Sequence, residues 1–439
     1  MKDRLAVGVI TLFGLALCLP GPGLPAGTDG PLRLNLDQCV GMAIEANVSV
    51  RQAAYDLDQS RYSVLGSASG LLPSFGWSST HSRSETPSLV EGDKLVESVK
   101  SYTSAFWLRE AASARTFFGV LESMAYKHAS EQGLRAAKHE AAYTAKQKYL
   151  EVLKTKRLLG VSEEALDLGK RRLEKAQALL DVGSGVKSDV LRAQVEVGNN
   201  ELELISARNA LRLAEIDLKH FLGITDDRAL ELEDILETGE TTGNLQGTLA
   251  EAMEGRPDIR AGSDVVAARK RAVWSQAGGW MPTFEFNWRK QYLAPEEKPE
   301  FPDRLADMWD DATWRWSLTA SVNIFDGLAT FSQVKIAGAQ LGSAKQDLEQ
   351  TRRDASLEVT RAFYNVEEAR QRVKVSKETV SLAEEELRLA EEKYRLGGGT
   401  MLEQIDAQVA LSQARTANIQ ALSDYLLSQA DLVRAAGRD

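Results

Sequence analysis

The strongest pattern in the chain is a stripe of apolar and small residues that recurs at alternating steps of three and four. One stripe runs from Val366 to Tyr394, and a second runs from Val152 to Leu180. Such steps place the stripe on one face of a helix and are typical of a coiled coil. We therefore predict two very long helices. The first, over about 117–181, would be roughly 95 Å long at about 1.5 Å per residue.

Each predicted long helix ends at a cluster of small residues. The clusters are Gly183-Ser184-Gly185 and Gly397-Gly398-Gly399. Glycine readily adopts a positive φ, which a tight reversal of the chain often requires. A second helical stretch follows each cluster. We therefore predict two helical hairpins with sharp tips, over about 117–223 and 331–437.

The two hairpins are copies of one another. Residues 117–223 match 331–437 without a gap at an offset of 214, and upstream positions match at an offset of 209. The difference indicates an insertion between Pro282 and Phe331. A tandem repeat of this kind predicts a fold with internal pseudo-symmetry. The predicted boundaries are 27–247 for the first repeat, including a linker at 224–247, and 248–439 for the second.

Each repeat opens with an Ala-rich helical segment that ends at a proline. These segments run from Ala43 to about Gly70, before Pro73, and from Leu249 to Gln276, before Pro282. Short segments follow in which aromatic residues alternate with small or polar ones. Such alternation predicts strands with one apolar and one polar face. The predicted strands lie at about 74–80, 101–109, 283–292 and 314–324.

Any one of these strands could belong to a hairpin of a soluble protein. Their recurrence with aromatic residues in both repeats favours a membrane barrel, in which aromatic side chains lie at the lipid interfaces. Four strands cannot close a barrel, and an open sheet edge cannot face lipid. We therefore expect several copies of the chain to pool their strands and their amphipathic hairpins into a hollow duct.

The N-terminus is typical of a secretory signal peptide, which we expect over residues 1–26. A short basic start precedes an apolar run of 15 residues, and prolines and glycines follow it before a cleavage site at Ala26. Lipid anchoring at Cys18 is an alternative, although Leu17 stands where a small residue normally precedes the lipidated cysteine. Cleavage would leave Cys39 as the only cysteine, which excludes an internal disulfide.

Charge and motif spacing narrow the function. The net charge of −10 argues against a nucleic-acid partner, whose phosphates need a basic surface. His139-Glu140 resembles the start of a zinc-protease motif, but Tyr143 stands where the second histidine is needed. The glycines at 183–185 lack the spacing of a phosphate loop. We therefore expect no enzyme activity, no cofactor and no metal site.

Three further features occur in the order that one known family shows. They are Leu71-Leu72-Pro73-Ser74 after the opening helix, Val322 to Gly327 after the last strand, and the tip segment Tyr394 to Gln408. Together they resemble the TolC-like outer membrane efflux proteins over essentially the whole mature chain. The resemblance implies a mainly α fold with a small β part. It also implies a homotrimer in outer-membrane lipid, whose β-barrel takes four strands from each chain and joins a long periplasmic α-helical barrel.

The resemblance also implies a function. The trimer would be a passive, porin-like channel of a tripartite efflux or type I secretion system. It would conduct substrates from a periplasmic adaptor protein and an inner-membrane pump to the exterior. Two other interpretations remain open at this point. A periplasmic adaptor also contains a long hairpin, though only one, flanked by β-rich segments, and a coiled-coil scaffold would need no strands.

The family's gate lies at the periplasmic tip of the helical barrel. By match to the tip motif, Glu403 and Asp406 fall where the family places rings of carboxylates in the pore constriction. An acidic, solvated helix face would explain the same two residues. Asp189 and Tyr394 fall where the family pairs an acid with a tyrosine to hold the closed state. Gly399 stands where some members carry a gating arginine, so the closed-state bonding of this chain would differ.

The resemblance implies adaptor docking at the hairpin tips. The matching positions are Gly183, Ser184, Gly397 and Gly398.

Overall fold

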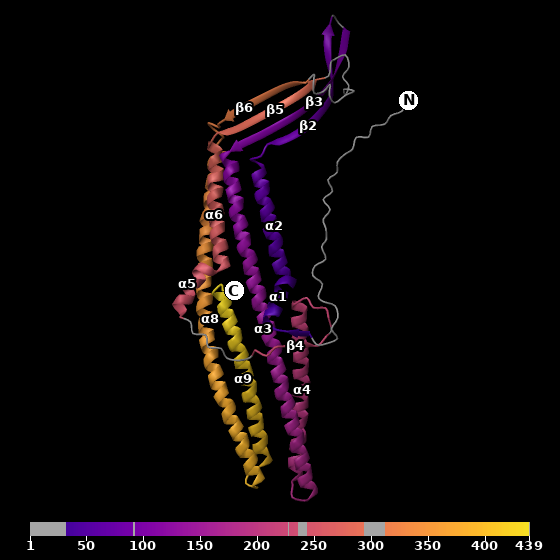
Figure 1. Cartoon of the computed structure of the whole chain (residues 1–439), viewed down its shortest axis with the longest axis vertical. Helices are drawn as coiled ribbons and strands as arrows, with labels where there is room; N and C mark the ends of the chain where they lie inside the picture. Colours follow the sequence, from indigo (N-terminus) through magenta and orange to yellow (C-terminus); the bar gives the residue numbers. More distant parts are fainter. Residues whose placement is uncertain (1–31, 91–92, 227, 236–243, 294–311, 439) are drawn as a thin grey trace, which may run out of the picture.

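The computed structural model describes residues 32–90, 93–226, 228–235, 244–293 and 312–438. The predicted signal peptide and Cys18 lie outside these residues, as does part of the linker at 224–247. The described part is elongated, with a curved sheet at one end and the tips of two helical hairpins at the other (Figure 1).

Two helical hairpins form most of the molecule. They consist of α3 (Ala114–Asp181) with α4 (Lys187–Phe221), and of α8 (Ala329–Arg395) with α9 (Met401–Ala435). The long helices α3 and α8 have 68 and 67 residues. The stripes predicted from the sequence form their buried faces, since Val152, Leu166 and Val366 are each at most 8% exposed.

Each Ala-rich opening segment forms two helices instead of the single helix expected from the sequence. They are α1 (Leu36–Ala46) and α2 (Val48–Ser69) in the first repeat, and α5 (Leu245–Gly255) and α6 (Pro257–Ala277) in the second. Asn47 causes the first break, because its side-chain oxygen accepts hydrogen bonds from the backbone N–H groups of Ser49 and Val50 and so caps α2. Pro257 causes the second, because proline disfavours helical backbone at the preceding residue.

The sheet at the far end contains four antiparallel strands in the order β2-β3-β5-β6. They are β2 (Ser74–Val90), β3 (Asp93–Ser113), β5 (Thr283–Leu293) and β6 (Thr313–Ser321). The predicted fold class, mainly helical with four strands in one small sheet, is confirmed. The strands β2 and β3 are much longer than expected, and they extend beyond the other two as a two-stranded ribbon (Figure 1).

One face of this sheet is apolar across all four strands. Residues directly opposite each other on antiparallel strands share a face. The pairs Phe75–Leu108, Leu108–Trp288 and Trp288–Trp316 therefore form one row from β2 to β6. This row is open to solvent at both ends, where Phe75 is 67% and Trp316 is 59% exposed. The opposite face is polar and includes an ion pair of 2.9 Å between Arg109 and Glu285.

A second, parallel sheet that was not predicted from the sequence lies half-way along the hairpins. Its strands β1 (Leu32–Leu34) and β4 (Leu230–Leu232) have only three residues each, too few for a recognisable alternation. They pack with α1, α3 and α4 around Tyr149, which is fully buried. The phenol of Tyr149 donates a hydrogen bond of 2.6 Å to the carbonyl oxygen of Glu233 and so ties the linker to α3.

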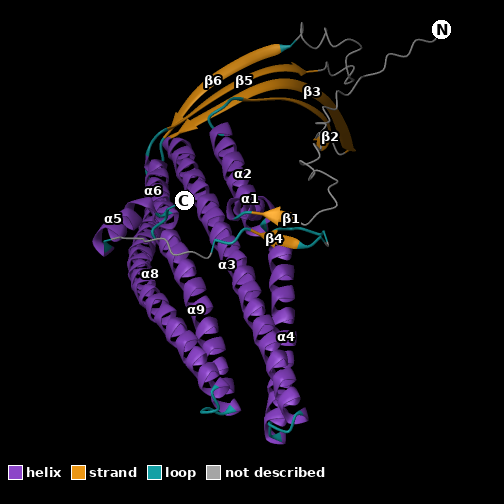
Figure 2. Cartoon of the chain, turned by 60° about the horizontal axis from the view of Figure 1, so that its bottom comes forward, coloured by secondary structure: helices purple, strands orange, loops and turns teal. Residues whose placement is uncertain are grey.

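The elements follow one lateral order at every level of the molecule. Near the tips, α8 packs on α9, α9 on α3, and α3 on α4 (Figure 2). Nearer the sheet, α8 packs on α6, α6 on α3, and α3 on α2. One edge of the molecule is therefore formed by β6 and α8, and the other by β2, α2 and α4. Within the described ranges, no helix is both long and apolar enough to cross a membrane.

A buried ion pair between α3 and α4 gives the first testable prediction. Arg172 and Glu196 lie 2.6 Å apart with side chains 7% exposed, and Glu196 Oε2 is buried and accepts no hydrogen bond from the described residues. Replacing Arg172 alone with Met should lower the free energy of unfolding by about 3–5 kcal/mol, because it leaves a buried carboxylate unpaired.

The double variant Arg172→Met/Glu196→Leu should recover most of that loss, since no charge then remains buried. The exposed pair Arg388–Glu385 is the control, and Arg388→Met should leave the free energy of unfolding nearly unchanged, because solvent screens both charges. Urea unfolding of the detergent-solubilised protein measures all three variants. A double variant no more stable than Arg172→Met would contradict the explanation.

Candidate functional site

The hairpin tips are closed by two identical turns. After α3, the N–H of Gly183 donates to Leu180 O and the N–H of Ser184 to Leu179 O. After α8, in the second repeat, the N–H of Gly397 donates to Tyr394 O and the N–H of Gly398 to Lys393 O. This arrangement is a Schellman motif, which needs a left-handed residue directly after the helix. Gly183 and Gly397 supply it with φ of +74° and +77°.

The two tips of one chain are joined by a small apolar core. Met401, the first residue of α9, is 1% exposed and packs against Ala176 of α3 and Val190 of α4. Tyr394 and Ile405 pack around this core. Met401 was not predicted from the sequence. Its signal was present, because Met401, Gln404, Gln408 and Leu411 recur at steps of three and four on the buried face of α9.

The structure brings two of the four predicted gate residues together. Asp189 lies in the first turn of α4, and Tyr394 lies in the last turn of α8. Burial raises the pKa of the Tyr394 phenol above its usual value, and the negative charge of Asp189 raises the pKa further. Lys175 of α3 lies over the same ring, with Nζ 5.3 Å from the centroid. Tyr394 thus lies between the hairpins, beside one acid and one base.

The other two predicted gate residues are exposed side chains on α9. Thr400 caps this helix by accepting a hydrogen bond of 3.2 Å from the N–H of Glu403. Asp406 lies three residues further along, so both carboxylates belong to the same exposed face. Within the part of the chain that the structure describes, neither carboxylate has an ion pair or a side-chain hydrogen bond. The single chain therefore does not bring them to Asp189 and Tyr394.

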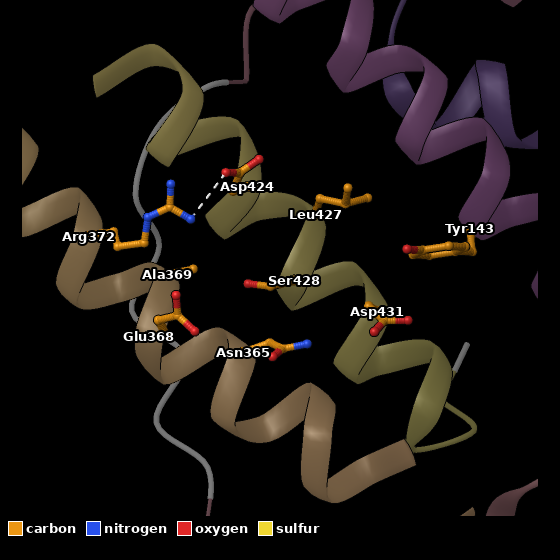
Figure 3. A pocket seen from close by; sticks show the side chains of 9 residues that line it. All are labelled: Tyr143, Asn365, Glu368, Ala369, Arg372, Asp424, Leu427, Ser428 and Asp431. Carbon is orange, nitrogen blue, oxygen red and sulfur yellow. Dashed lines mark ion pairs between the residues drawn. The ribbon is translucent and has the colours of Figure 1, made fainter. Parts of the chain in front are cut away.

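A groove lies between α8 and α9, higher on the second hairpin (Figure 3). It contains a hollow of about 310 Å³, in which Arg372 of α8 and Asp424 of α9 form an ion pair of 3.6 Å. A second hollow of about 530 Å³ continues it, where Ala417 and Ala421 leave room beside Val375. We call these two hollows the α8/α9 groove. Because the side chains of α9 in this groove are small, larger side chains of another helix can pack into it.

Both edges of the molecule carry exposed apolar stripes. On α8, leucine and valine recur every seven residues and are 45–75% exposed. On α4, the exposed apolar residues are 52–67% exposed. Each stripe lies on the side of its helix opposite the face that packs within the chain. The α8 stripe consists of Val375, Leu382, Leu389 and Leu396, and the α4 stripe of Leu191, Val195, Leu202, Ile205 and Ile216.

These features define a channel subunit: an arc of long helices that continues into a curved sheet with an apolar, exposed face. The family model described as "Outer membrane efflux protein" matches residues 248–438. The chain is 24% identical over 312 residues to the outer membrane efflux protein BepC of Brucella suis biovar 1. This alignment covers 71% of this chain and 66% of BepC. The chain is 25% identical over 421 residues to the outer membrane protein OprJ of Pseudomonas aeruginosa, and this second alignment covers 92% of this chain and 84% of OprJ.

The fold is shared with solved membrane proteins. A crystal structure of a membrane protein from Pseudomonas aeruginosa superposes with a TM-score of 0.78 at 22% identity, covering 92% of this chain and 93% of that one. The similarity to outer membrane efflux proteins therefore covers the second repeat in the family model and 71–92% of the chain in the two relatives. This family consists of TolC-like channels, not enzymes, in the outer membrane with a periplasmic extension. The predicted family is confirmed, whereas the gate and tip residues stay predictions.

The electrostatic effect of Asp189 on Tyr394 gives the second prediction. Asp189→Asn should lower the pKa of Tyr394 toward its usual value, because the variant removes the negative charge that opposes the phenolate. Burial remains, so the pKa should stay above that of an exposed tyrosine. NMR titration of the ¹³C-labelled tyrosines measures the shift, with Tyr394→Phe to assign the signal. Asp406→Asn is the control, and an equal shift in that variant would refute the pairing.

Proposed function

We propose that the chain is one of three subunits that close head to tail into an outer-membrane efflux duct. The observation that carries the proposal is the match between the two edges of the molecule. One edge exposes the α8 stripe and the free side of β6, and the other exposes the α4 stripe and the free side of β2. When one edge of each copy binds the other edge of the next copy, the same contact repeats from copy to copy until a ring closes.

The heights of the two stripes support this contact. Leu202 lies 15 residues after Lys187, where α4 begins, and Leu382 lies 13 residues before Arg395, where α8 ends. At about 1.5 Å per residue, both side chains are about 20 Å above the tip turns. Side chains of the α4 stripe in one copy would therefore reach α8 of the next copy, where the α8/α9 groove offers room between small residues.

The sheet supports the same closure at the other end. A free strand edge presents unpaired N–H and C=O groups, which lipid cannot satisfy. Pairing β6 of one copy with β2 of the next removes every free edge among these strands. The apolar row from Phe75 to Trp316 would then face lipid around the outside of the barrel.

The tips complete the duct as its gate. Three copies would bring three Glu403 and three Asp406 side chains around one axis, and such a ring attracts cations. Tyr394, which packs in the core between the two hairpins, would hold the hairpins of each copy together just above that ring, with Asp189 beside it. The turns at Gly183, Ser184, Gly397 and Gly398 would meet the periplasmic adaptor, and an inner-membrane pump would supply the energy.

Ring closure has a direct test. Leu382→Glu should prevent trimer formation, because it places a charge in a contact that excludes water. Size-exclusion chromatography with light scattering in detergent measures the subunit number. Lys374→Glu introduces the same side chain on an exposed position of the same helix and should leave the trimer intact.

The combination Leu202→Lys/Leu382→Glu should restore part of the trimer, since the two new charges would face each other across the contact. A stable trimer of Leu382→Glu alone would refute the head-to-tail contact.

The gate has a separate test in planar lipid bilayers. Glu403→Ala/Asp406→Ala should raise the conductance and increase the concentration of a trivalent cation for half-block by about tenfold, or about 1.4 kcal/mol. Glu45→Ala/Glu254→Ala removes the same charge from exposed positions of α1 and α5 and should change neither quantity. Unchanged block in the first variant would exclude Glu403 and Asp406 from the pore.

A further inference from the structure

A large cavity lies half-way along the molecule, away from the tips and from both edges. Its volume is about 910 Å³, at the upper end of the range for ligand sites in proteins. The α3 helix forms its floor, α1 forms one wall, and the start of α6 with the C-terminal end of α9 forms the other. We call it the equatorial cavity. It joins the two repeats, because α1 belongs to the first and α6 and α9 to the second.

The lining of the equatorial cavity is strongly basic, although the chain as a whole carries a net charge of −10. Among the described residues that line the cavity, Asp37 alone is acidic. A cleft lined by one sign of charge concentrates ions of the opposite sign. The lysines and arginines of the lining are Arg135, Lys138, Lys146, Arg260, Arg434 and Arg438.

Some of these cations already have acidic partners. Arg434 is paired with Glu358 and Asp431, and Arg438 is paired with Glu251. Three others, all on α3, are different. Across the described ranges, the side chains of Arg135, Lys138 and Lys146 make no ion pair and no hydrogen bond. The uncompensated charge of the equatorial cavity therefore lies along its floor.

The same floor also presents a polar atom without a partner. Gln132 Oε1 is buried and accepts no hydrogen bond from any described residue, although Gln132 lines the cavity. A buried amide oxygen left without a donor destabilises the protein. Carboxylates on a ligand would pair with the three cations, and an N–H group of the same ligand would satisfy Gln132 once its side chain turns toward the cavity.

The spacing of these groups favours an extended ligand over a compact anion. Arg135 and Lys146 are 11 residues apart, which is about 16 Å along a helix. No single phosphate or sulfate covers that length. An extended peptide rises about 3.3 Å per residue, so about five residues cover it, with alternate side chains on one face. Backbone N–H groups of such a peptide would be available to Gln132.

We infer that the equatorial cavity binds an acidic, extended peptide segment of a periplasmic partner protein. Acidic side chains on alternate residues of the segment pair with Arg135, Lys138 and Lys146, and its backbone donates to Gln132. Val40 and Ile44 of α1 give the apolar part of the wall. This site is separate from the duct and from the tips, and it does not depend on the number of subunits in the ring.

The test uses the full-length protein in detergent and a fluorescein-labelled peptide of about seven residues in which Glu and Ala alternate. Fluorescence anisotropy should show saturable binding that weakens as salt is added, because exposed charge pairs are screened. Arg135→Gln/Lys138→Gln/Lys146→Gln should raise the dissociation constant by about tenfold or more. Arg135→Lys/Lys138→Arg/Lys146→Arg should leave it nearly unchanged, since every charge is kept.

Two controls make the result decisive. Lys345→Gln/Lys374→Gln/Lys377→Gln removes the same charge from exposed positions of α8 and should not alter binding. Equal loss in this control variant, or no loss in the α3 variant, would overturn the site. Citrate is a compact anion that cannot reach all three cations. If citrate displaced the labelled peptide as effectively as the unlabelled peptide does, the extended-peptide assignment would be wrong. Unchanged thermal unfolding of the α3 variant shows that its fold is intact.

Discussion

The apolar stripes on the two edges of the molecule are the constraint on which the rest of the structure depends. Burying one exposed leucine or valine contributes about 1.5–3 kcal/mol. The four residues of the α8 stripe together therefore represent about 6–12 kcal/mol, as much as the whole stability of an ordinary domain. A single chain that leaves these apolar side chains exposed to water forgoes that stabilisation, which contact with another chain would provide. In the proposed ring, its stability would be tied to assembly in the way of an obligate oligomer.

The duplication decides what kind of assembly the edges permit. Both hairpins consist of a long and a short helix. The long helix α8 lies at one edge of the molecule, whereas the short helix α4 lies at the other. The edges are therefore complementary and not identical. A two-fold contact would join α8 to α8 and leave every α4 stripe in water. A head-to-tail contact covers both stripes, and in the sheet it covers both free strands as well.

The sequence predicted those parts of the fold that depend on local periodicity. Steps of three and four gave the buried faces of α3 and α8, and alternation gave four strands with an apolar face. The breaks at Asn47 and Arg256 were missed, because one capping side chain or one proline outweighs an otherwise helical stretch. The strands β1 and β4 and the contacts of Met401 depend on residues far apart in the chain. For the predicted gate, periodicity shows that Glu403 and Asp406 share one face of α9. It does not show which residues of other chains lie opposite that face.

The distribution of buried residues along the molecule indicates where it can move. Around Tyr149, half-way along the hairpins, eleven buried residues form one core that includes both short strands. At the tips, the core that joins the two hairpins contains three buried residues, with Met401 at its centre. Local stability follows buried contact, so separation of the tips costs far less than disruption of the middle. In the proposed duct, the Tyr149 core would therefore be the pivot, and Tyr394 with Asp189 would lie where a small change in interaction energy has the largest effect on separation of the tips.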